Sequence, residues 1–441
     1  MNSRLFSATA IVFIFLCIVW QQTATAKVYI DINEPGFRQF PIAVCDFENK
    51  STLITAGDGV NEQIAADVRF YLGLTGIFEL LDKNSFLDGT EPGRPEIIRF
   101  PDWSLIGADF LLRGDAAIAD GRLTAQARLY DIARARVIFQ KKYNGHSGDV
   151  RQIARAISSD ILLALTGDEG DFNTKIALVI KKKNASDIFS INYDATGLKP
   201  VTSHQSIVTS PRWSPDGRYL AFTSYKEGRP AVYLRHLPTG RERKVAAFPG
   251  LNMCGSFSPD SKKLLLTLSK DGNEEIYALD VESMKLTRLT NNYAIDVSPA
   301  WSPDGRKIAF VSNRSGTPQI FVMDAGGDNV NRLTYEGNYN TSPSWSPRGD
   351  KIAYEGLINR KYQIFTVDMQ GNNPVQLTFD ETDNEYPSWS PSGRQIVYSS
   401  HRGAKTRICI MNANGQNTRI LFEGKDHLAM PSWSGRPDTV D

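Results

Sequence analysis

The 441-residue sequence is poor in cysteine and has no surplus of charge of either sign. Of its four cysteines, the three beyond the N-terminal segment, Cys45, Cys254 and Cys409, are far apart in the chain. An odd, scattered set of this kind excludes a disulfide-stapled scaffold and is typical of small buried side chains. The 50 basic residues balance 49 acidic ones, so the protein has no long-range attraction for nucleic acid or for a membrane surface.

The sequence also lacks the motifs that accompany common enzyme chemistry. It contains no HExxH, no CxxC and no phosphate-binding P-loop. The segment Gly145–Asp149 has the outline of a nucleophile elbow around Ser147, but it lacks the second glycine of that motif and is more typical of a helix start. The five histidines share no metal-ligand spacing. We therefore predict no catalytic residue, no metal and no cofactor.

Long apolar runs are absent except near the N-terminus. Arg4 precedes an apolar run of 13 residues, Ala8–Trp20, which is too short to span a bilayer. Ala24–Ala26 then offers small residues at both positions of a cleavage site. These features predict a signal peptide over residues 1–26, a mature chain that begins at Lys27, and no membrane-spanning segment after it. An uncleaved anchor is the alternative interpretation.

What the sequence does contain is one motif repeated at a fixed spacing in its second half. Each copy carries an aromatic residue 44 positions after the one before, at Trp213, Phe257, Trp301, Trp345, Trp389 and Trp433. Around these residues the chain reads PRWSPDG, GSFSPD, SPAWSPDG, SPSWSPRG, YPSWSPSG and MPSWSG. Self-similarity at about 40–50 residues is typical of a β-propeller with one four-stranded blade per repeat.

The third copy shows how one repeat supplies four strands. An inner strand that carries Trp301 leads into the turn Pro303–Gly305, where proline presets φ and glycine tolerates a positive φ. The apolar stretch Lys307–Val311 is the predicted second strand, Gln319–Met323 the third and Val330–Thr334 the outer one. One repeat therefore predicts one complete blade.

The last copy is too short for a blade, because only eight residues follow Trp433. Its missing strands are predicted upstream of the first copy, at Lys175–Lys181, Asp187–Tyr193 and Leu198–Ser203. We therefore predict an all-β six-bladed propeller over residues 175–435, closed by pairing of the C-terminal strand with N-terminal propeller strands. Such closure removes free sheet edges. Residues 436–441 form a C-terminal tail.

Residues 27–167 predict a different, small N-terminal α/β domain. Phe40–Phe47 is typical of a buried strand, and Asp120-Gly121 predicts a hairpin between two longer strands. Apolar residues recur every four positions in Val150–Leu165, which predicts an amphipathic helix with Gly167 as its C-cap. Residues 168–174 form a polar linker to the propeller.

These features together resemble the TolB family, the periplasmic component of the Tol–Pal system of Gram-negative bacteria. The repeat alone is not specific, since prolyl oligopeptidase propellers share it. The resemblance rests on its combination with a secretion signal, a preceding α/β domain and a helix that ends Leu165-Thr166-Gly167. The chain departs from the pattern at Phe257, which replaces a tryptophan, and at Trp433-Ser434-Gly435.

The resemblance implies a monomeric, non-catalytic binding protein of the periplasm. Such proteins dock the peptidoglycan-associated lipoprotein Pal on one propeller face and engage TolA, an inner-membrane protein, through the mature N-terminal segment. They support outer-membrane integrity and outer-membrane invagination during cell division. The TolA-like segment would here consist of Lys27, Val28, Tyr29, Ile30, Asp31 and Ile32. Its alternation suits strand addition to a partner sheet, and an edge strand of its own domain is the alternative.

The Pal-like site can be placed from propeller geometry. The loops that enter the inner strands lie on one face, around the central channel, and loops on a rigid scaffold are where binding residues concentrate. In this chain they mix apolar tips with polar groups, as protein interfaces do. The predicted contact residues are Leu251, Asn252, Met253, Ile295, Asp296, Asn340, Asn384, Glu385 and His427.

A secreted propeller enzyme, a lyase or hydrolase with its site at the central channel, is the alternative function. It would require acid–base groups or metal ligands that converge on the axis, and His204 and His427 are the candidates. No nucleic-acid partner is expected, because the charge is balanced and the chain carries a secretion signal.

Overall fold

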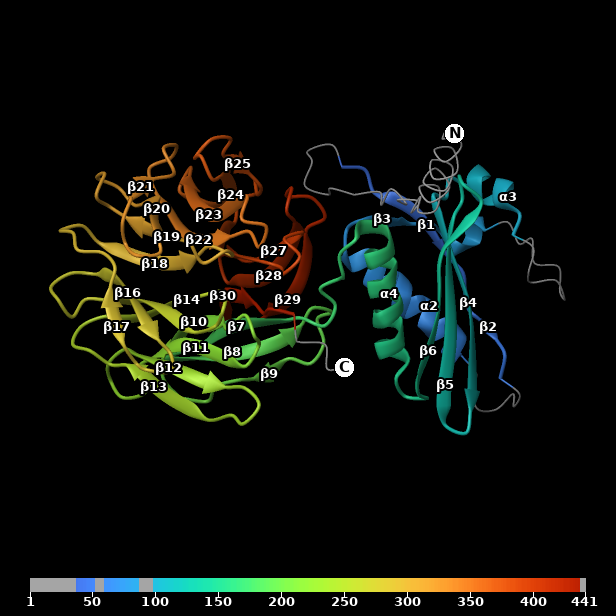
Figure 1. Ribbon diagram of the computed structural model, residues 1–441, viewed down its shortest axis with the longest axis horizontal. Helices are drawn as coiled ribbons and strands as arrows, with labels where there is room; N and C mark the ends of the chain where they lie inside the picture. The colour runs from blue at the N-terminus through green and yellow to red at the C-terminus, as the bar shows by residue number, and fades with distance from the viewer. Residues whose placement is uncertain (1–36, 52–58, 87–97, 437–441) are drawn as a thin grey trace, which may run out of the picture.

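The computed structural model describes residues 37–51, 59–86 and 98–436. An N-terminal domain lies beside a ring of blades, and two helices lie between its sheet and the ring (Figure 1). The predicted signal peptide and the TolA-like segment Lys27–Ile32 lie outside the described residues. No helix among the described residues combines the length and apolar character needed to cross a membrane.

The N-terminal domain is built on a mixed sheet. Its strands are β1 (Phe40–Val44), β2 (Glu48–Asn49), β3 (Phe78–Leu80), β4 (Phe110–Ala119), β5 (Arg122–Asp131) and β6 (Arg136–His146). Their order is β3-β1-β4-β5-β6, with β2 beside β4. The predicted hairpin joins β4 to β5, and both Asp120 (φ 50°) and Gly121 (φ 73°) have the left-handed backbone that a tight type I′ turn requires.

The helices of this domain are α2 (Val60–Leu74), α3 (Phe100–Leu105) and α4 (Val150–Thr166), with a 3-10 turn at Lys83–Ser85. The predicted amphipathic helix is confirmed as α4, whose stripe of Ile153, Ile157, Ile161 and Leu165 is buried. It ends at Gly167 with φ 72°, where the glycine N–H donates to the Leu163 carbonyl. The α4 stripe packs with α2 against the sheet.

The remaining strands form six four-stranded sheets, numbered here as blades 1 to 6. Blade 1 is β10 (Val208–Trp213), β11 (Tyr219–Ser224), β12 (Ala231–His236) and β13 (Glu242–Ala246); blade 2 is β14 (Asn252–Phe257), β15 (Lys263–Leu268), β16 (Glu275–Asp280) and β17 (Leu286–Arg288). Blade 3 is β18 (Asp296–Trp301), β19 (Lys307–Ser312), β20 (Gln319–Asp324) and β21 (Asn331–Arg332). Blade 4 is β22 (Asn340–Trp345), β23 (Lys351–Ile358), β24 (Lys361–Asp368) and β25 (Val375–Gln376). Blade 5 is β26 (Asp383–Trp389), β27 (Gln395–Arg402), β28 (Lys405–Asn412) and β29 (Arg419–Gly424).

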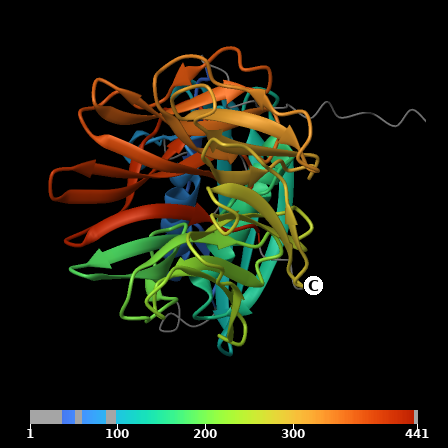
Figure 2. The same cartoon turned by 90° about the vertical axis from the view of Figure 1, so that its left-hand side faces the viewer.

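Blade 6 closes the ring with strands from both ends of the propeller. The C-terminal β30 (His427–Trp433) pairs with β7 (Lys175–Lys182), which is followed by β8 (Ala185–Asn192) and β9 (Lys199–Pro200). The predicted six blades and their closure are therefore confirmed. Figure 2 shows the blades arranged around the channel, with the N-terminal domain behind them.

Every inner strand contains a bulge just before its aromatic residue. In blade 3 the pairing with β19 shifts between Val297 and Ala300, and Ser298 has φ 54° ahead of Pro299. The same shift occurs in the other five blades. Because proline has no N–H to donate, it is tolerated in a sheet at bulges. In blade 2 the equivalent residue is Gly255. The bulge lets each inner strand continue in register beyond this position, so these strands begin earlier than the sequence predicts.

The repeated tryptophan joins neighbouring blades. Its indole N–H donates to a carbonyl on the inner strand of the preceding blade, as in Trp213 to Ser432, Trp345 to Ala300 and Trp389 to Ser344, at 3.0–3.1 Å. Trp433 instead donates to the Thr174 hydroxyl at 2.8 Å. The repeated aromatic residue therefore links neighbouring inner strands by a hydrogen bond at three blade boundaries, whereas Phe257 has no indole and the Trp301 N–H has no partner among the described residues.

The two domains share one continuous core. Tyr71 of α2, Phe172, Tyr193 and Trp433 form a chain of ring contacts with centroids 5.5–6.0 Å apart. The predicted polar linker 168–174 is therefore packed rather than free: Asp171, Phe172 and Thr174 are buried. These aromatic contacts pack the N-terminal domain against the propeller.

The two propeller faces differ in what covers them. We call the face formed by the loops that enter the inner strands the entering-loop face, and the opposite face, formed by the WSPDG-type turns, the turn face. The N-terminal domain packs on the turn face at blades 5 and 6, where Arg394 donates to Thr166 at 2.7 Å and Tyr193 donates to the Leu74 carbonyl at 2.8 Å. No described residue of the N-terminal domain covers the entering-loop face.

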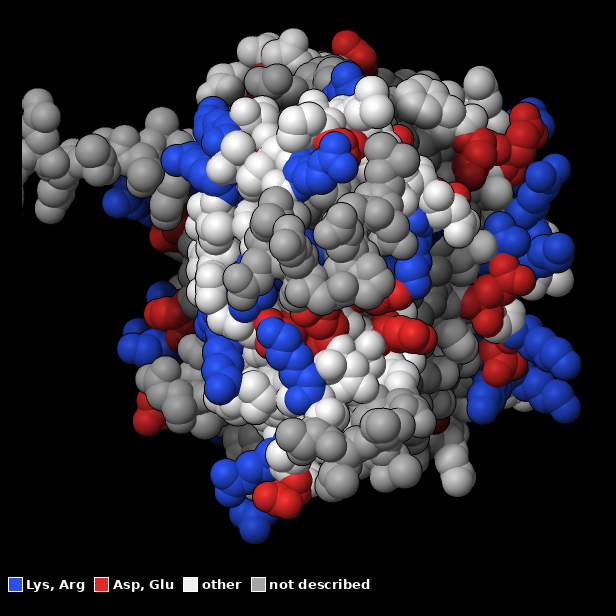
Figure 3. All heavy atoms as spheres, turned by 90° about the vertical axis from the view of Figure 1, so that its right-hand side faces the viewer, with Lys and Arg blue, Asp and Glu red and all other residues white. Residues whose placement is uncertain are grey.

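The described part of the far side of the N-terminal domain carries charged side chains of both signs (Figure 3). Figure 3 shows basic and acidic side chains interspersed over its described part. This agrees with the balanced composition of the chain.

Candidate functional site

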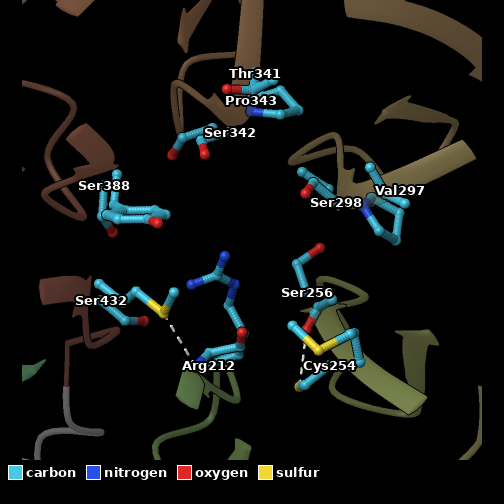
Figure 4. A pocket seen from close by; sticks show the side chains of 18 of the residues that line it. Arg212, Cys254, Ser256, Val297, Ser298, Thr341, Ser342, Pro343, Ser388 and Ser432 are labelled. Atoms are coloured by element: carbon cyan, nitrogen blue, oxygen red, sulfur yellow. Dashed lines mark hydrogen bonds between the residues drawn. The ribbon is translucent and has the colours of Figure 1, made fainter. Parts of the chain in front are cut away.

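The centre of the propeller is a cavity of about 570 Å³ that the six inner strands line. The bulged residues and the small residues beside the tryptophans face into it, among them Ser298, Ser342, Ser388 and Ser432 (Figure 4). Near the entering-loop end its wall includes Leu251, Met253 and Tyr339; at the turn end it includes Trp213, Trp301 and Trp345. The channel wall thus mixes serine hydroxyls with apolar side chains, and further apolar groups lie at its mouth.

Of the described residues that line the cavity, two are charged, Arg212 and Glu355. They belong to blades 1 and 4, which are three blades apart in the ring. Glu355 is buried and accepts hydrogen bonds from Thr341 Oγ1 at 2.6 Å, Ser342 Oγ at 2.9 Å and the Tyr386 N–H at 2.9 Å. Burial raises the pKa of Glu355 above its ordinary value, and these hydrogen bonds oppose that shift.

Four of the nine predicted contact residues lie inside the blades. Asn252, Asp296, Asn340 and Asn384 occupy the same position in successive inner strands, and their side chains are at most 3 % exposed. They are not loop residues, because the bulge extends each inner strand to include them. A partner on the face would find no surface on these side chains, so this part of the predicted site is corrected.

For two of them, Asn340 and Asn384, burial comes with a hydrogen bond to the preceding blade. Asn340 donates to Gln319 Oε1 at 2.8 Å, and the same oxygen accepts from Thr334 Oγ1 at 2.8 Å. Gln319 and Thr334 belong to the preceding blade, so the amide joins two blades. Asn384 contacts Gln363 in the same way, at 3.3 Å.

Asn252 instead donates to the Phe248 and Gly250 carbonyls of the loop before its strand, and Asp296 pairs with Arg314 of its own blade. The 44-residue recurrence of asparagine or aspartate was therefore a signal for a buried polar position.

The other five predicted contact residues reach the surface. Ile295 is 43 % exposed, His427 is exposed, and Leu251, Met253 and Glu385 are partly exposed. Ile295 and Leu251 lie in loops, whereas the other three lie on inner strands. These residues come from blades 2, 3, 5 and 6, so the structure distributes them around the channel mouth.

Exposed aromatic side chains on the same face were missed by the sequence reasoning. Tyr293, Tyr335 and Phe379 are 89 %, 67 % and 77 % exposed. They lie in the loops that lead from an outer strand to the next inner strand, which cross the entering-loop face. Tyr335 and Phe379 each follow a Leu-Thr pair and are 44 residues apart, so the repeat itself could have identified them.

The two histidines proposed for an enzyme lie in separate clusters, and neither lines the channel. His204 lies 3.0 Å from Glu242 Oε2 and 2.9 Å from Ser224 Oγ. The ring of His427 lies 4.7 Å from that of His401, which is 3.1 Å from Glu385 Oε2. The described residues contain no group of three or more potential ligands placed to hold a metal ion.

Comparison with known families decides the assignment. Residues 163–436 match the family described as the TolB beta propeller domain, and residues 28–138 match the TolB amino-terminal domain. The chain belongs to the TolB family. The predicted family resemblance is therefore confirmed.

Individual TolB proteins show how far the similarity extends. The crystal structure of TolB from Acinetobacter baumannii superposes with a TM-score of 0.80 at 29 % identity, covering 90 % of this chain and 97 % of that one. The Tol-Pal system protein TolB of Syntrophus aciditrophicus is 44 % identical over 228 residues, and that of Bordetella avium is 33 % identical over 251. These alignments cover 50–56 % of this chain and 50–54 % of the relatives, so the chain spans about half the length of the curated relatives it matches.

The His427 imidazole of this TolB family member should make stability depend on pH. Partial burial, the neighbouring His401 and Lys181 lower the pKa of His427 below its ordinary 6.5, and Glu385 opposes this. Because the folded pKa is depressed, the stabilising contribution is present above pH 6.5 and is lost as the pH falls through the folded pKa. We expect His427→Gln to reduce the fall in melting temperature between about pH 7.5 and 5.5.

The matched control for this measurement is His146→Gln, an exposed histidine in the N-terminal domain. It should leave the pH dependence as in the wild type. An equal effect of the two substitutions would contradict a special role for His427.

Proposed function

We propose that this protein is a non-catalytic, periplasmic, protein-binding component of the Tol–Pal system. A Pal-like lipoprotein docks on the entering-loop face, and a TolA-like protein binds the mature N-terminal segment. Through these contacts the protein supports outer-membrane integrity and invagination during cell division. The relatives named as Tol-Pal system proteins support the system assignment.

One observation carries the choice of face. The N-terminal domain occupies the turn face, which leaves the entering-loop face accessible to a protein. That face combines exposed aromatic side chains with a central channel whose wall mixes serine hydroxyls and apolar side chains. Interfaces are enriched in aromatic side chains, and a few such residues carry most of the binding energy.

The aromatic side chains provide the test. Tyr335→Ala and Phe379→Ala should each weaken binding of the purified lipoprotein domain by about 1–2 kcal/mol, or about 5–30-fold in Kd. Both side chains are mostly exposed, so neither substitution should change the melting temperature by more than about 1 °C. Calorimetric titration of each variant measures the effect.

Two further variants separate the surfaces. Leu105→Ala removes an apolar side chain that is 80 % exposed in the N-terminal domain, and it should leave lipoprotein binding unchanged. Deletion of residues 27–32 should abolish binding of the TolA-like domain and also leave lipoprotein binding unchanged. If Leu105→Ala weakens lipoprotein binding while the two face variants do not, the face assignment is wrong.

A further inference from the structure

Arg212 breaks the pattern of the inner strands. It precedes the repeated aromatic residue, where the other five blades carry Ser256, Ala300, Ser344, Ser388 and Ser432. The small residues keep the channel open, whereas the guanidinium of Arg212 extends into it (Figure 4). Arg212 is therefore a long cationic side chain at a position where the other blades carry a small residue, and the repeat gives no structural reason for it.

The guanidinium has no counterion within the described part of the chain. The single hydrogen bond it makes to protein there runs from Nη1 to the adjacent Pro211 carbonyl at 3.0 Å. Among the described residues no carboxylate lies within 4.0 Å of it, and the one acidic residue that they contribute to the channel wall, Glu355, already accepts three other donors. A guanidinium has five N–H donors, so most of them face the channel without a protein acceptor.

An unpaired, partly buried charge is costly to the folded protein. Burial lowers the pKa of Arg212, which reflects the unfavourable environment of its charge. A serine at this position, as in four other blades, would avoid that cost. Such a cost is typical of a residue whose partner is a ligand, because functional sites are where stability is given up.

The surroundings select the chemical class of that ligand. One guanidinium matches one carboxylate in a bidentate pair and neutralises it, whereas a phosphate would bring about two charges. The serine hydroxyls of the wall can donate to the remaining carboxylate lone pairs. The cavity of about 570 Å³ admits side chains rather than a folded domain.

We propose that Arg212 binds the carboxylate of an acidic side chain that the docked protein partner inserts into the channel from the entering-loop face. This inference rests on the proposed function, because it assumes a partner on that face. The apolar residues at the mouth, Leu251, Met253 and Tyr339, would surround the stem of the inserted side chain, and Arg212 would fix its tip. Fixing a single charge at the channel axis would set the register of the whole partner.

Calorimetry with the lipoprotein domain tests the role of Arg212. Arg212→Gln keeps the stem and two donors but removes the charge, and we expect Kd to rise by at least about 30-fold. Arg212→Lys keeps the charge but loses the paired N–H donors of the guanidinium, so its Kd should lie between that of Arg212→Gln and that of the wild type. Arg218→Gln, an exposed arginine on the turn face of the same blade, should bind as the wild type does.

A merely structural role for Arg212 predicts something different. If Arg212 only stabilised the fold, Arg212→Gln would have a lower melting temperature than the wild type. If its charge is unpaired, the substitution should leave the melting temperature unchanged or raise it. A Kd for Arg212→Gln within twofold of the wild-type value would overturn the proposal and leave the proposed function standing.

A second measurement distinguishes failure of the carboxylate site at Arg212 from failure of the proposed function. Sodium acetate is titrated into the full chain while the indole N–H resonances of the channel tryptophans are followed by NMR. Saturable shifts in the wild type that Arg212→Gln abolishes support a carboxylate site. If the lipoprotein domain does not bind the wild type, the proposed function is wrong, and the acetate titration then decides on Arg212. No acetate shifts in that case would overturn the carboxylate site as well.

Discussion

Replacing Trp301 with alanine is expected to lower the free energy of unfolding by about 3–5 kcal/mol, the range for truncation of a buried aromatic side chain. The Trp301 ring is 8 % exposed and lies between blades 2 and 3. It packs with Leu265 of the second blade and with Ile308 and Phe310 of its own. Loss of the ring would leave a cavity at a blade boundary that rigid sheets on both sides cannot close. Denaturant unfolding at constant m-value measures the change.

Replacement by phenylalanine provides a graded control. The indole N–H of Trp301 has no hydrogen-bond partner among the described residues, and the equivalent residue of blade 2 is already Phe257. Trp301→Phe should therefore cost less than Trp345→Phe, which removes the hydrogen bond to the Ala300 carbonyl. A loss below about 1 kcal/mol for Trp301→Ala would show that the ring is not part of the core.

Asp296→Ala is expected to destabilise the ring by about 3 kcal/mol, the lower end of the range for breaking a buried ion pair from one side. Asp296 Oδ2 lies 2.7 Å from Arg314 Nη2, and the two side chains are 0 % and 18 % exposed. The lower end applies because Arg314 can recover some hydration. Burial raises the pKa of Asp296 above its ordinary 3.8 and Arg314 opposes it, so the carboxylate remains costly even when paired.

The double variant separates the pair from its parts. Asp296→Asn introduces the residue that blades 2, 4 and 5 carry at this position. Combined with Arg314→Gln, it should cost less than Asp296→Ala alone, because no unpaired charge remains. Chemical denaturation of the single and double variants completes the cycle. Equal losses for Asp296→Ala and the double variant would contradict an ion-pair origin of the effect.

The buried Asn340 and Asp296 illustrate why part of the site could not be predicted from the sequence. A polar residue at the start of an inner strand is equally typical of a binding loop and of an internal brace. For Asn340 the choice depends on Gln319 and Thr334, which the preceding blade brings to it. A single repeat does not reveal which groups of its neighbour face it.

The sequence by itself determined the architecture. The 44-residue spacing, the turn residues after each tryptophan and the incomplete last copy are enough to predict six blades and their closure. The stripe Ile153, Ile157, Ile161 and Leu165 likewise predicts α4. Both predictions succeed for one physical reason, because strands, tight turns and amphipathic helices depend on residues that are close together in the chain.

Only the tertiary structure decided what each face of the ring can do. It buries Asn252 and Asp296, leaves Tyr335 and Phe379 exposed, and places the N-terminal domain on the turn face. Arg212 is one basic residue among many in the sequence, and the lack of a counterion for it among the described residues appears only when blades from the whole ring surround it. Burial, pairing and accessibility depend on residues that are distant in the chain and meet only in the folded ring.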